Sequence, residues 1–265
     1  MKENWFLIGD IHGEVAPVAY FYNQNRERLS LDECHNNIIL LGDVGCNYSI
    51  TGSRDYEFKQ QLSSLPFTYI CLRGNHEARV KEVMKRFPHA WEEKNKYDGT
   101  IYVEKDFPDI EYLSDIPGLY NFSGYRTLSI PGAYSVDKWY RLRNHWQWFA
   151  DEQLSEQEME QGRKLMEEGP VDLVISHTCP IQYEPRDLFL KSLNQTMIDK
   201  TMERYLGEIE CKLDYKRWAW GHYHDDRLYP WDDDREKLML FNETVVDLVK
   251  FMEMDRTNCL DDIRA

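Results

Sequence analysis

Residues 5–12 read Trp-Phe-Leu-Ile-Gly-Asp-Ile-His, a short apolar run that ends in a glycine and is followed by polar side chains. The same design recurs at residues 38–43, Ile-Ile-Leu-Leu-Gly-Asp, and at residues 69–76, Tyr-Ile-Cys-Leu-Arg-Gly-Asn-His. Runs of this length, rich in Ile, Leu and aromatic residues, are typical of strands buried on both faces. Segments of helical character, about 14–29 and 55–64, separate them. The order of elements therefore predicts strand–helix units in a parallel sheet.

The second half of the chain repeats this design less regularly. Three apolar runs precede a glycine or a histidine, and two further runs follow them near the end of the chain. We expect strands at residues 127–130, 171–175, 217–220, 237–241 and 244–251.

One helix between these strands has a clear start signal, because Ser155 and Glu158 have the spacing of a capping box. The middle of the chain, about 88–124, is aromatic and irregular, and we expect it to cover the sheet. The chain has no low-complexity linker and no repeat of solenoid period. We therefore expect one layered α/β domain over residues 1–265, with an aromatic cover segment at about 88–150.

Composition narrows the class of protein. The chain has 265 residues, of which 42% are hydrophobic, so a sizeable core is possible. Its net charge of −15 repels nucleic acid, and a polyanionic substrate would need a local positive site. The 6 cysteines form no CxxC pair, which indicates reduced thiols. Neither a membrane-spanning run nor a signal-peptide pattern is present, so we expect a soluble, cytoplasmic protein; the sequence does not indicate an oligomeric state.

Polar side chains follow five of the expected strands. In open α/β sheets, ligands bind outside the carboxyl ends of the strands, so these side chains should lie close together. Carboxylate, imidazole and amide donors suit Mn, Fe, Zn or similar divalent ions, and a bridging carboxylate would let two ions share the site. The residues concerned are Asp10, His12, Asp43, Asn75, His76, His177, His222 and His224.

In this order, the five blocks resemble those of the calcineurin-like metallophosphoesterases. The blocks are Asp10-Ile-His12, Gly42-Asp43, Gly74-Asn75-His76-Glu77, His177 after a strand, and Gly221-His222-Tyr-His224. They span nearly the whole expected domain, from residue 5 to about 224. The resemblance implies a four-layer α/β/β/α sandwich and a binuclear centre of Mn, Fe, Zn or Ni that hydrolyses phosphate esters.

The resemblance also implies a role for each residue. The first ion would be held by Asp10, His12 and His224. The second ion would be held by Asn75, His177 and His222. Asp43 would bridge the two ions, and a bridging hydroxide would attack the phosphorus in line. His76 would not bind metal, but would protonate the leaving oxygen or stabilise the transferred phosphoryl group.

The second block departs from one branch of the family. In the second block, the protein phosphatases of this family usually carry Gly-Asp-x-x-Asp-Arg-Gly. This chain has Cys46 in place of the second aspartate and Asn47 in place of the arginine. The last block, residues 221–224, looks like the phosphodiesterase and nuclease branch. We therefore expect phosphodiesters, including nucleotides or nucleic-acid ends, to be hydrolysed at least as well as monoesters. A serine/threonine-type protein phosphatase and a non-catalytic protein-binding scaffold are the alternatives, although His76 argues against a scaffold.

Substrate-binding candidates lie partly outside the five blocks. Residues 137–149 interleave cations with tryptophan and tyrosine, so bases could stack there while the cations meet phosphates. The favoured interpretation is instead an aromatic cap over the sheet with solvated charges. Arginines here or in the third block could replace the missing phosphate clamp and restore a preference for monoesters. Glu77 is interpreted as a helix-start residue and residues 232–234 as a solvated turn. The candidates for substrate binding are Arg73, Arg141, Arg143 and His145.

Overall fold

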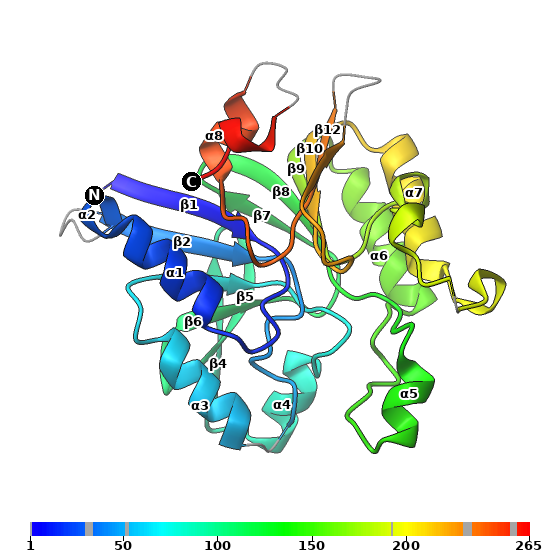
Figure 1. Ribbon diagram of the computed structural model, residues 1–265, viewed down its shortest axis with the longest axis horizontal. Helices are drawn as coiled ribbons and strands as arrows, with labels where there is room; N and C mark the ends of the chain where they lie inside the picture. Colours follow the sequence, from blue (N-terminus) through cyan, green and yellow to red (C-terminus); the bar gives the residue numbers. More distant parts are fainter. Residues whose placement is uncertain (1, 30–33, 51–52, 192, 230–234, 255–258) are drawn as a thin grey trace.

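Two β-sheets pack face to face, and helices cover the outer side of each, as the computed structural model shows (Figure 1). The layers follow the order α/β/β/α, which confirms the expected architecture. The structure describes residues 2–29, 34–50, 53–191, 193–229, 235–254 and 259–265. The expected turn at residues 232–234 lies outside the described residues.

The first sheet has a parallel centre with antiparallel edges, in the order β13-β1-β2-β3-β6-β5-β4. Its parallel strands are β1 (Lys2–Ile8), β2 (Cys34–Leu40), β3 (Thr68–Cys71) and β6 (Phe107–Leu113). Its antiparallel strands are β13 (Val246–Asp247), β5 (Gly99–Glu104) and β4 (Trp91–Lys96).

The second sheet has the same plan, in the order β11-β12-β10-β9-β8-β7. Its parallel strands are β12 (Glu236–Met239), β10 (Tyr215–Trp220), β9 (Val171–Ser176) and β8 (Tyr125–Ile130). Its antiparallel edge strands are β11 (Arg227–Tyr229) and β7 (Gly118–Phe122).

Most helices pack on the outer faces of the two sheets, and α5 lies apart from the sheets (Figure 1). The first sheet is covered by α1 (Ala16–Gln24), α2 (Arg26–Leu29), α3 (Ser53–Leu62) and α4 (Val80–Arg86). The second sheet is covered by α6 (Glu156–Met166) and α7 (Thr201–Lys212). The remaining α-helices are α5 (Lys138–Arg143) and α8 (Leu248–Glu253). Short 3-10 helices occur at Ile181–Tyr183, Arg186–Leu188, Gln195–Met197 and Leu260–Asp262.

The strands are apolar on both faces because each sheet lies between two layers. In β1, Trp5 and Leu7 pack into the core between the sheets, whereas Phe6 and Ile8 pack toward the helices. This alternation follows from the period of two in a strand, and it confirms that the continuous apolar runs are strands buried on both faces. The expected helix after Ser155 is also confirmed as α6, with its capping box formed by Ser155 and Glu158.

Two expected elements are wrong. Residues 88–124 are not irregular, because they form β4, β5, β6 and β7 of the two sheets. In β4, only Trp91 is buried and the other side chains are exposed. Its Glu, Lys and Asn residues therefore lack the apolar pattern by which a strand is predicted from sequence. Residues 244–251 form only two residues of strand before α8 begins. The Asp247 side chain accepts a hydrogen bond from the backbone N–H of Lys250 at 3.1 Å, which caps that helix.

The carboxyl ends of parallel strands from both sheets meet, and backbone hydrogen bonds hold the loops that follow them. The N–H of His12 after β1 donates to the carbonyl of Asp43 after β2 at 2.8 Å. The N–H of Gly221 after β10 donates to the carbonyl of His177 after β9 at 3.1 Å. The polar side chains of the five blocks are therefore brought to one region of the molecule.

Candidate metal centre

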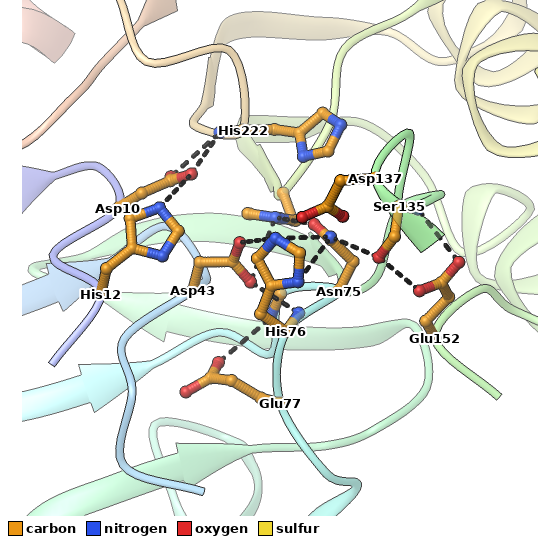
Figure 2. A network of polar contacts seen from close by, with 12 residues as sticks. Asp10, His12, Asp43, Asn75, His76, Glu77, Ser135, Asp137, Glu152 and His222 are labelled. Carbon is orange, nitrogen blue, oxygen red and sulfur yellow. Dashed lines mark hydrogen bonds and ion pairs between the residues drawn. The ribbon is translucent and has the colours of Figure 1, made fainter. Parts of the chain in front are cut away.

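Figure 2 shows Asp43 between Asp10 and His12 on one side and Asn75 and His76 on the other. All five side chains come from the loops that follow β1, β2 and β3. The second sheet adds histidines after β9 and β10. Among the described residues, two groups of three side chains have ligand atoms within 4.8 Å of one another, and Asp10 belongs to both.

The first group consists of Asp10, His12 and His224. The Nε2 atoms of His12 and His224 lie 2.8 Å apart. Oδ2 of Asp10 lies 3.5 Å from Nε2 of His224 and 3.9 Å from Nε2 of His12. Two imidazole nitrogens and a carboxylate oxygen thus converge on one point, and this donor set fits a divalent cation.

The second group consists of Asp10, Asp43 and His177, with Asn75 beside them. The ring of His177 is oriented by the carbonyl of Leu41, which can only accept a hydrogen bond and lies 2.8 Å from Nδ1. Nε2 of His177 therefore faces inward, 2.8 Å from Oδ1 of Asn75 and 3.6 Å from Oδ1 of Asp43. Because three acceptor atoms face one another, the site favours a positive charge between them.

The electrostatics of the second group agree with its geometry. Burial lowers the pKa of His177, but the carboxylates of Asp43 and Asp10 raise it to about 9. Burial raises the pKa of Asp43, but His76, His177 and His12 hold it well below its usual value. The carboxylate is thus kept ionised although it is only 2% exposed. A buried anion among imidazoles suits a site for metal cations.

Four of these residues have left-handed backbone. The φ angle is positive at each of them: 47° at His12, 46° at Asp43, 72° at His222 and 55° at His224. This conformation is unfavourable for residues other than glycine and concentrates at functional sites. The sharp turns at the strand ends therefore direct these residues toward the candidate metal site, although the turns are unfavourable for the backbone.

Three glycines leave room for these side chains. A Cβ atom on Gly42 would lie 2.1 Å from Nδ1 of His177, and one on Gly221 would lie 2.1 Å from Oδ1 of Asp10. A Cβ atom on Gly74 would lie 2.0 Å from Oδ1 of Asp43. Each glycine in the motifs is therefore required by the close approach of a candidate ligand.

His222 is the exception among the predicted metal-binding residues. Its backbone N–H donates to Oδ1 and Oδ2 of Asp10 at 2.9 and 3.0 Å, and its ring lies 5.0 Å from the ring of His177. Its ring nitrogens belong to neither group of three among the described residues. In this structure, His222 thus holds Asp10 through its backbone.

His76 lies between two cavities that open beside the candidate ligands. The larger cavity has a volume of about 310 Å³ and the smaller about 200 Å³, and both are lined by His76 and Asp43. Nε2 of His76 lies 3.7 Å from Oδ2 of Asp43 and 3.0 Å from Nη2 of Arg141. The ring therefore adjoins the metal site and also faces space that a substrate could fill.

Of the expected substrate-binding residues, only Arg141 lies at the site. It lines the smaller cavity, and its Nε donates to Oδ2 of Asp137 at 2.8 Å. Arg73 is buried elsewhere, because its Nη1 donates to the carbonyls of Gly74 and Glu152 at 3.1 and 3.0 Å. Arg143 and His145 are exposed and line neither cavity.

The expected aromatic cap over the sheet is wrong. Trp139 is 70% exposed, Tyr140 56% and Trp146 52%. Tyr140 and Trp146 pack edge to face against each other, and Lys138 lies 4.0 Å from the ring centre of Trp148. These side chains therefore contact one another on and after α5 rather than covering a sheet.

Two residues that fix the orientation of the Asn75 amide, Ser135 and Glu152, could not be found from the sequence. Nδ2 of Asn75 donates to Oγ of Ser135 at 2.8 Å, and this hydroxyl donates to Oε2 of Glu152 at 2.5 Å (Figure 2). Because Nδ2 is engaged in this way, Oδ1 of Asn75 must face His177. Ser135 and Glu152 come from the segments after β8 and before α6, so only the fold shows that they meet.

Glu77 connects two of the loops and does not begin a helix. Its Oε1 accepts the N–H of Gly45 at 2.9 Å, and its Oε2 accepts the N–H of Gly74 at 3.2 Å. The next helix, α4, begins only at Val80. The interpretation of Glu77 as a helix-start residue is therefore wrong, because its carboxylate is buried and binds the turns beside Asp43 and Asn75.

The calcineurin-like phosphoesterase family model matches residues 6–226, which include every candidate ligand. The chain belongs to the calcineurin-like phosphoesterase family. The members of this family are phosphoesterases that depend on two metal ions. The resemblance of the five blocks is thereby confirmed.

Several solved structures are similar to this chain at low sequence identity. One has a TM-score of 0.53 at 14% identity, and the match covers 94% of this chain and 96% of that chain. A dimetal phosphatase from Danio rerio has a TM-score of 0.49 at 12% identity, covering 92% of both chains. Phosphopantetheinyl hydrolase from Mycobacterium tuberculosis has a TM-score of 0.46 at 15% identity, covering 91% of this chain and 90% of that chain. No curated protein is detectably similar in sequence.

Among the described residues of this family member, the helices are too short or too polar to cross a bilayer.

Proposed function

We propose that this chain hydrolyses phosphate esters at a centre of two divalent metal ions. The observation that carries the proposal is the convergence of two groups of ligand atoms, which share Asp10, beside His76 and two cavities. Neither a structural role nor a binding scaffold accounts for a histidine that adjoins the ligands and also faces open space. Among the described residues, no disulfide joins Cys34, Cys46, Cys71, Cys179 and Cys211, which supports a reducing compartment such as the cytoplasm.

The fold supports the following assignment of ligands. The first ion would be held by Asp10, His12 and His224, and the second by Asn75 and His177 with His222. Asp43 would bridge the two ions, since it groups with Asp10 and His177 and lies beside His12 as well (Figure 2). The metal identity is one of Mn, Fe, Zn or Ni. When bound, the ions supply Lewis acidity and a strongly nucleophilic water.

Arg141 and His76 have different roles toward the substrate: Arg141 binds a phosphoryl oxygen and His76 protonates the leaving oxygen. The guanidinium can only donate a hydrogen bond, so Nε2 of His76 accepts from Nη2 of Arg141 at 3.0 Å. A phosphoryl oxygen that enters between them takes over this donor. Nε2 of His76 no longer accepts from Arg141, so it can take up a proton from water, which the nearby carboxylate of Asp43 favours, and give that proton to the leaving oxygen. Arg141 remains on the phosphoryl oxygen and neutralises its charge.

This arrangement favours phosphomonoesters. Asn47, which stands where protein phosphatases carry an arginine, is buried and accepts a hydrogen bond from Nζ of Lys59 at 3.3 Å. Arg141 supplies the missing guanidinium from another part of the chain, and a monoester dianion offers it more charge than a diester does. The expectation of phosphodiester hydrolysis rests on the absence of such an arginine and on the last block. Diester hydrolysis is the second candidate, favoured by the block at residues 221–224.

A metal and substrate screen tests the proposal. Purified protein is loaded with Mn, Ni, Zn or Mg, and its metal content is measured by elemental analysis. Turnover of phenyl phosphate, bis-nitrophenyl phosphate and a phosphoserine peptide is then compared with that of His76→Gln. We expect two ions per chain and monoester turnover that His76→Gln reduces. Metal-loaded protein that hydrolyses none of the three would overturn the proposal and favour the scaffold alternative. A higher kcat/KM for the diester would establish the second candidate.

A further inference from the structure

The larger cavity beside His76 has a mostly apolar outer wall. Its lining includes Leu188, Phe189, Leu190 and Leu193 from the segment that precedes α7, and Val136 from the segment that precedes α5. Leu188 and Leu190 are 40% and 61% exposed. Exposed aliphatic side chains that gather at one site indicate a surface that binds an apolar group.

Phe189 in this wall is held by other residues that line the cavity or lie beside it. The ring of Phe189 stacks on the ring of Tyr223 with centroids 6.5 Å apart. The hydroxyl of Tyr223 lies 3.1 Å from Oγ1 of Thr178, and Nζ of Lys200 lies 4.7 Å from the ring centre of Phe189. The cavity is therefore a formed pocket that is continuous with the metal centre.

The two cavities differ in the cations that line them. The larger one is lined by the carboxylates of Asp137, Asp199 and Glu203 in addition to Asp43, and among its described lining residues the only Lys or Arg is Lys200, whose Nζ pairs with Glu184 at 2.7 Å. The smaller cavity is lined by Asp43, Asp55 and Glu77 but also by two arginines, Arg54 and Arg141. Among the described lining residues, a phosphoryl anion therefore meets guanidinium donors only in the smaller cavity.

One carboxylate of the larger cavity also disfavours an anion at close range. Glu203 is 3% exposed, its Oε1 accepts from Oγ1 of Thr178 at 2.9 Å, and its Oε2 has no hydrogen-bond partner among the described residues. A further negative charge here would face a carboxyl oxygen that has no hydrogen-bond donor among the described residues, whereas an uncharged group would not add charge to this buried site.

Resting on the proposed function, we propose that the larger cavity binds the alcohol part of the ester as an uncharged aromatic or aliphatic group. The phosphoryl oxygens face Arg141 on the side of the smaller cavity. The ester oxygen then faces the other side of His76, where the leaving group meets the apolar wall. Water attacks phosphorus, the P–O bond to the alcohol breaks, and the alcohol leaves with a proton. Substrates whose alcohol carries further phosphates are excluded from this cavity by its carboxylates.

A series of esters with similar alcohol acidity tests this inference. The metal-loaded protein is given ethyl, 2-cyclohexylethyl and 3-carboxypropyl phosphate, so that differences in kcat/KM report the alcohol pocket rather than leaving-group chemistry. We expect 2-cyclohexylethyl phosphate to exceed ethyl phosphate about tenfold or more, since burial of a ring of this size is worth several methylene groups. We expect 3-carboxypropyl phosphate to fall below ethyl phosphate.

Two variants of the same segment sharpen the test. Leu190→Asp places a charge on the cavity wall and should reduce the ratio of 2-cyclohexylethyl to ethyl phosphate by about tenfold. Met197→Asp is the matched control, because Met197 is 76% exposed and lines neither cavity, and it should leave the ratio unchanged. Equal effects of the two variants would overturn the assignment to this wall.

Binding of alkylphosphonates separates this inference from the proposed function. By calorimetry on metal-loaded protein, 2-cyclohexylethylphosphonate should bind about tenfold or more tightly than ethylphosphonate. If no ester is hydrolysed, the proposed function fails, and the phosphonate ratio still decides the pocket. If esters are hydrolysed but the ratios in hydrolysis and binding are near one, the pocket assignment fails while the proposed function stands.

Discussion

Nη2 of Arg141 lies 3.0 Å from Nε2 of His76, although the two residues are 65 positions apart in the sequence. This contact places a permanent positive charge beside the histidine that faces both cavities. Asp137 holds the guanidinium in position by accepting from its Nε at 2.8 Å. We propose that Arg141, on α5, supplies the cation that the resembling protein phosphatases carry at the position of Asn47.

Replacement of Arg141 should weaken substrate binding. In Arg141→Gln, the phosphoryl group loses a charge-assisted hydrogen bond, and such a bond contributes about 1.5–3 kcal/mol. We expect KM for phenyl phosphate to rise about tenfold to a hundredfold. Arg143→Gln, on the same helix but exposed, is the matched control and should leave KM unchanged. Equal KM values for the two variants would show that Arg141 does not contact the phosphate.

His76→Gln should separate chemistry from metal binding. The two ions should remain, because His76 is not among the ligands, while kcat falls by about 10²–10⁴-fold through the loss of a proton donor. The fall should be smaller for nitrophenyl phosphate than for an alkyl phosphate, since a good leaving group needs no proton. Elemental analysis and kcat on both esters provide the measurements. Equal losses on the two esters would contradict the acid role, and loss of metal would make His76 a ligand.

Asp43→Asn should weaken both metal sites at once. A single carboxylate that bridges two ions loses its charge toward both, so less than one ion per chain is expected after dialysis. His12→Ala should mainly empty one site, since His12 belongs only to the group with Asp10 and His224. Elemental analysis of the two variants distinguishes these outcomes. Retention of two ions by Asp43→Asn would rule out the bridging role.

Ser135→Ala should weaken metal binding without removing a ligand. The change frees Nδ2 of Asn75, so the amide no longer has a fixed orientation toward His177. Loss of such supporting hydrogen bonds commonly costs 10–100-fold in metal affinity. Ser129→Ala is the control, because Ser129 is also buried and its hydroxyl has no hydrogen-bond partner among the described residues. Metal titration by calorimetry should show the loss only for Ser135→Ala.

Gly42→Ala should destabilise the fold and the second metal site together. The new Cβ would lie 2.1 Å from Nδ1 of His177, and overpacking of this kind costs about 1–3 kcal/mol. Gly124→Ala is matched in backbone, with φ of 88° against 102°, but its Cβ would meet nothing within 4 Å. Both variants bear the cost of a left-handed alanine, about 1–2 kcal/mol. Urea unfolding and metal titration should show the additional loss only in Gly42→Ala.

The parallel strands and most candidate ligands are predictable from the sequence because both signals are local. Each strand is a short apolar run, and each polar block follows at its carboxyl end, so the parallel topology brings the blocks together. His177 illustrates this, since it has no motif beyond its place after β9. The contribution of His222 was less predictable, because the turn at residues 221–224 directs its backbone rather than its ring toward Asp10.

The parts that the sequence did not reveal depend on contacts between distant segments. Ser135 and Glu152 meet behind Asn75 only because the chain between β8 and α6 folds back. Arg141 and Arg143 look alike in sequence, and only the position of α5 makes one buried and the other exposed. β4 was missed because an edge strand with polar faces lacks the apolar pattern on which strand prediction depends.

Left-handed backbone lowers the stability of the fold at four residues that the proposed activity needs. These residues are His12, Asp43, His222 and His224. Glycine would adopt each of these turns without the cost of about 1–3 kcal/mol that other residues bear there. A laboratory selection for thermal stability alone should therefore replace these residues with glycine first. The selected variants would unfold at a higher temperature but would be inactive. A selection that also demands turnover should leave these four positions unchanged and find its gains elsewhere.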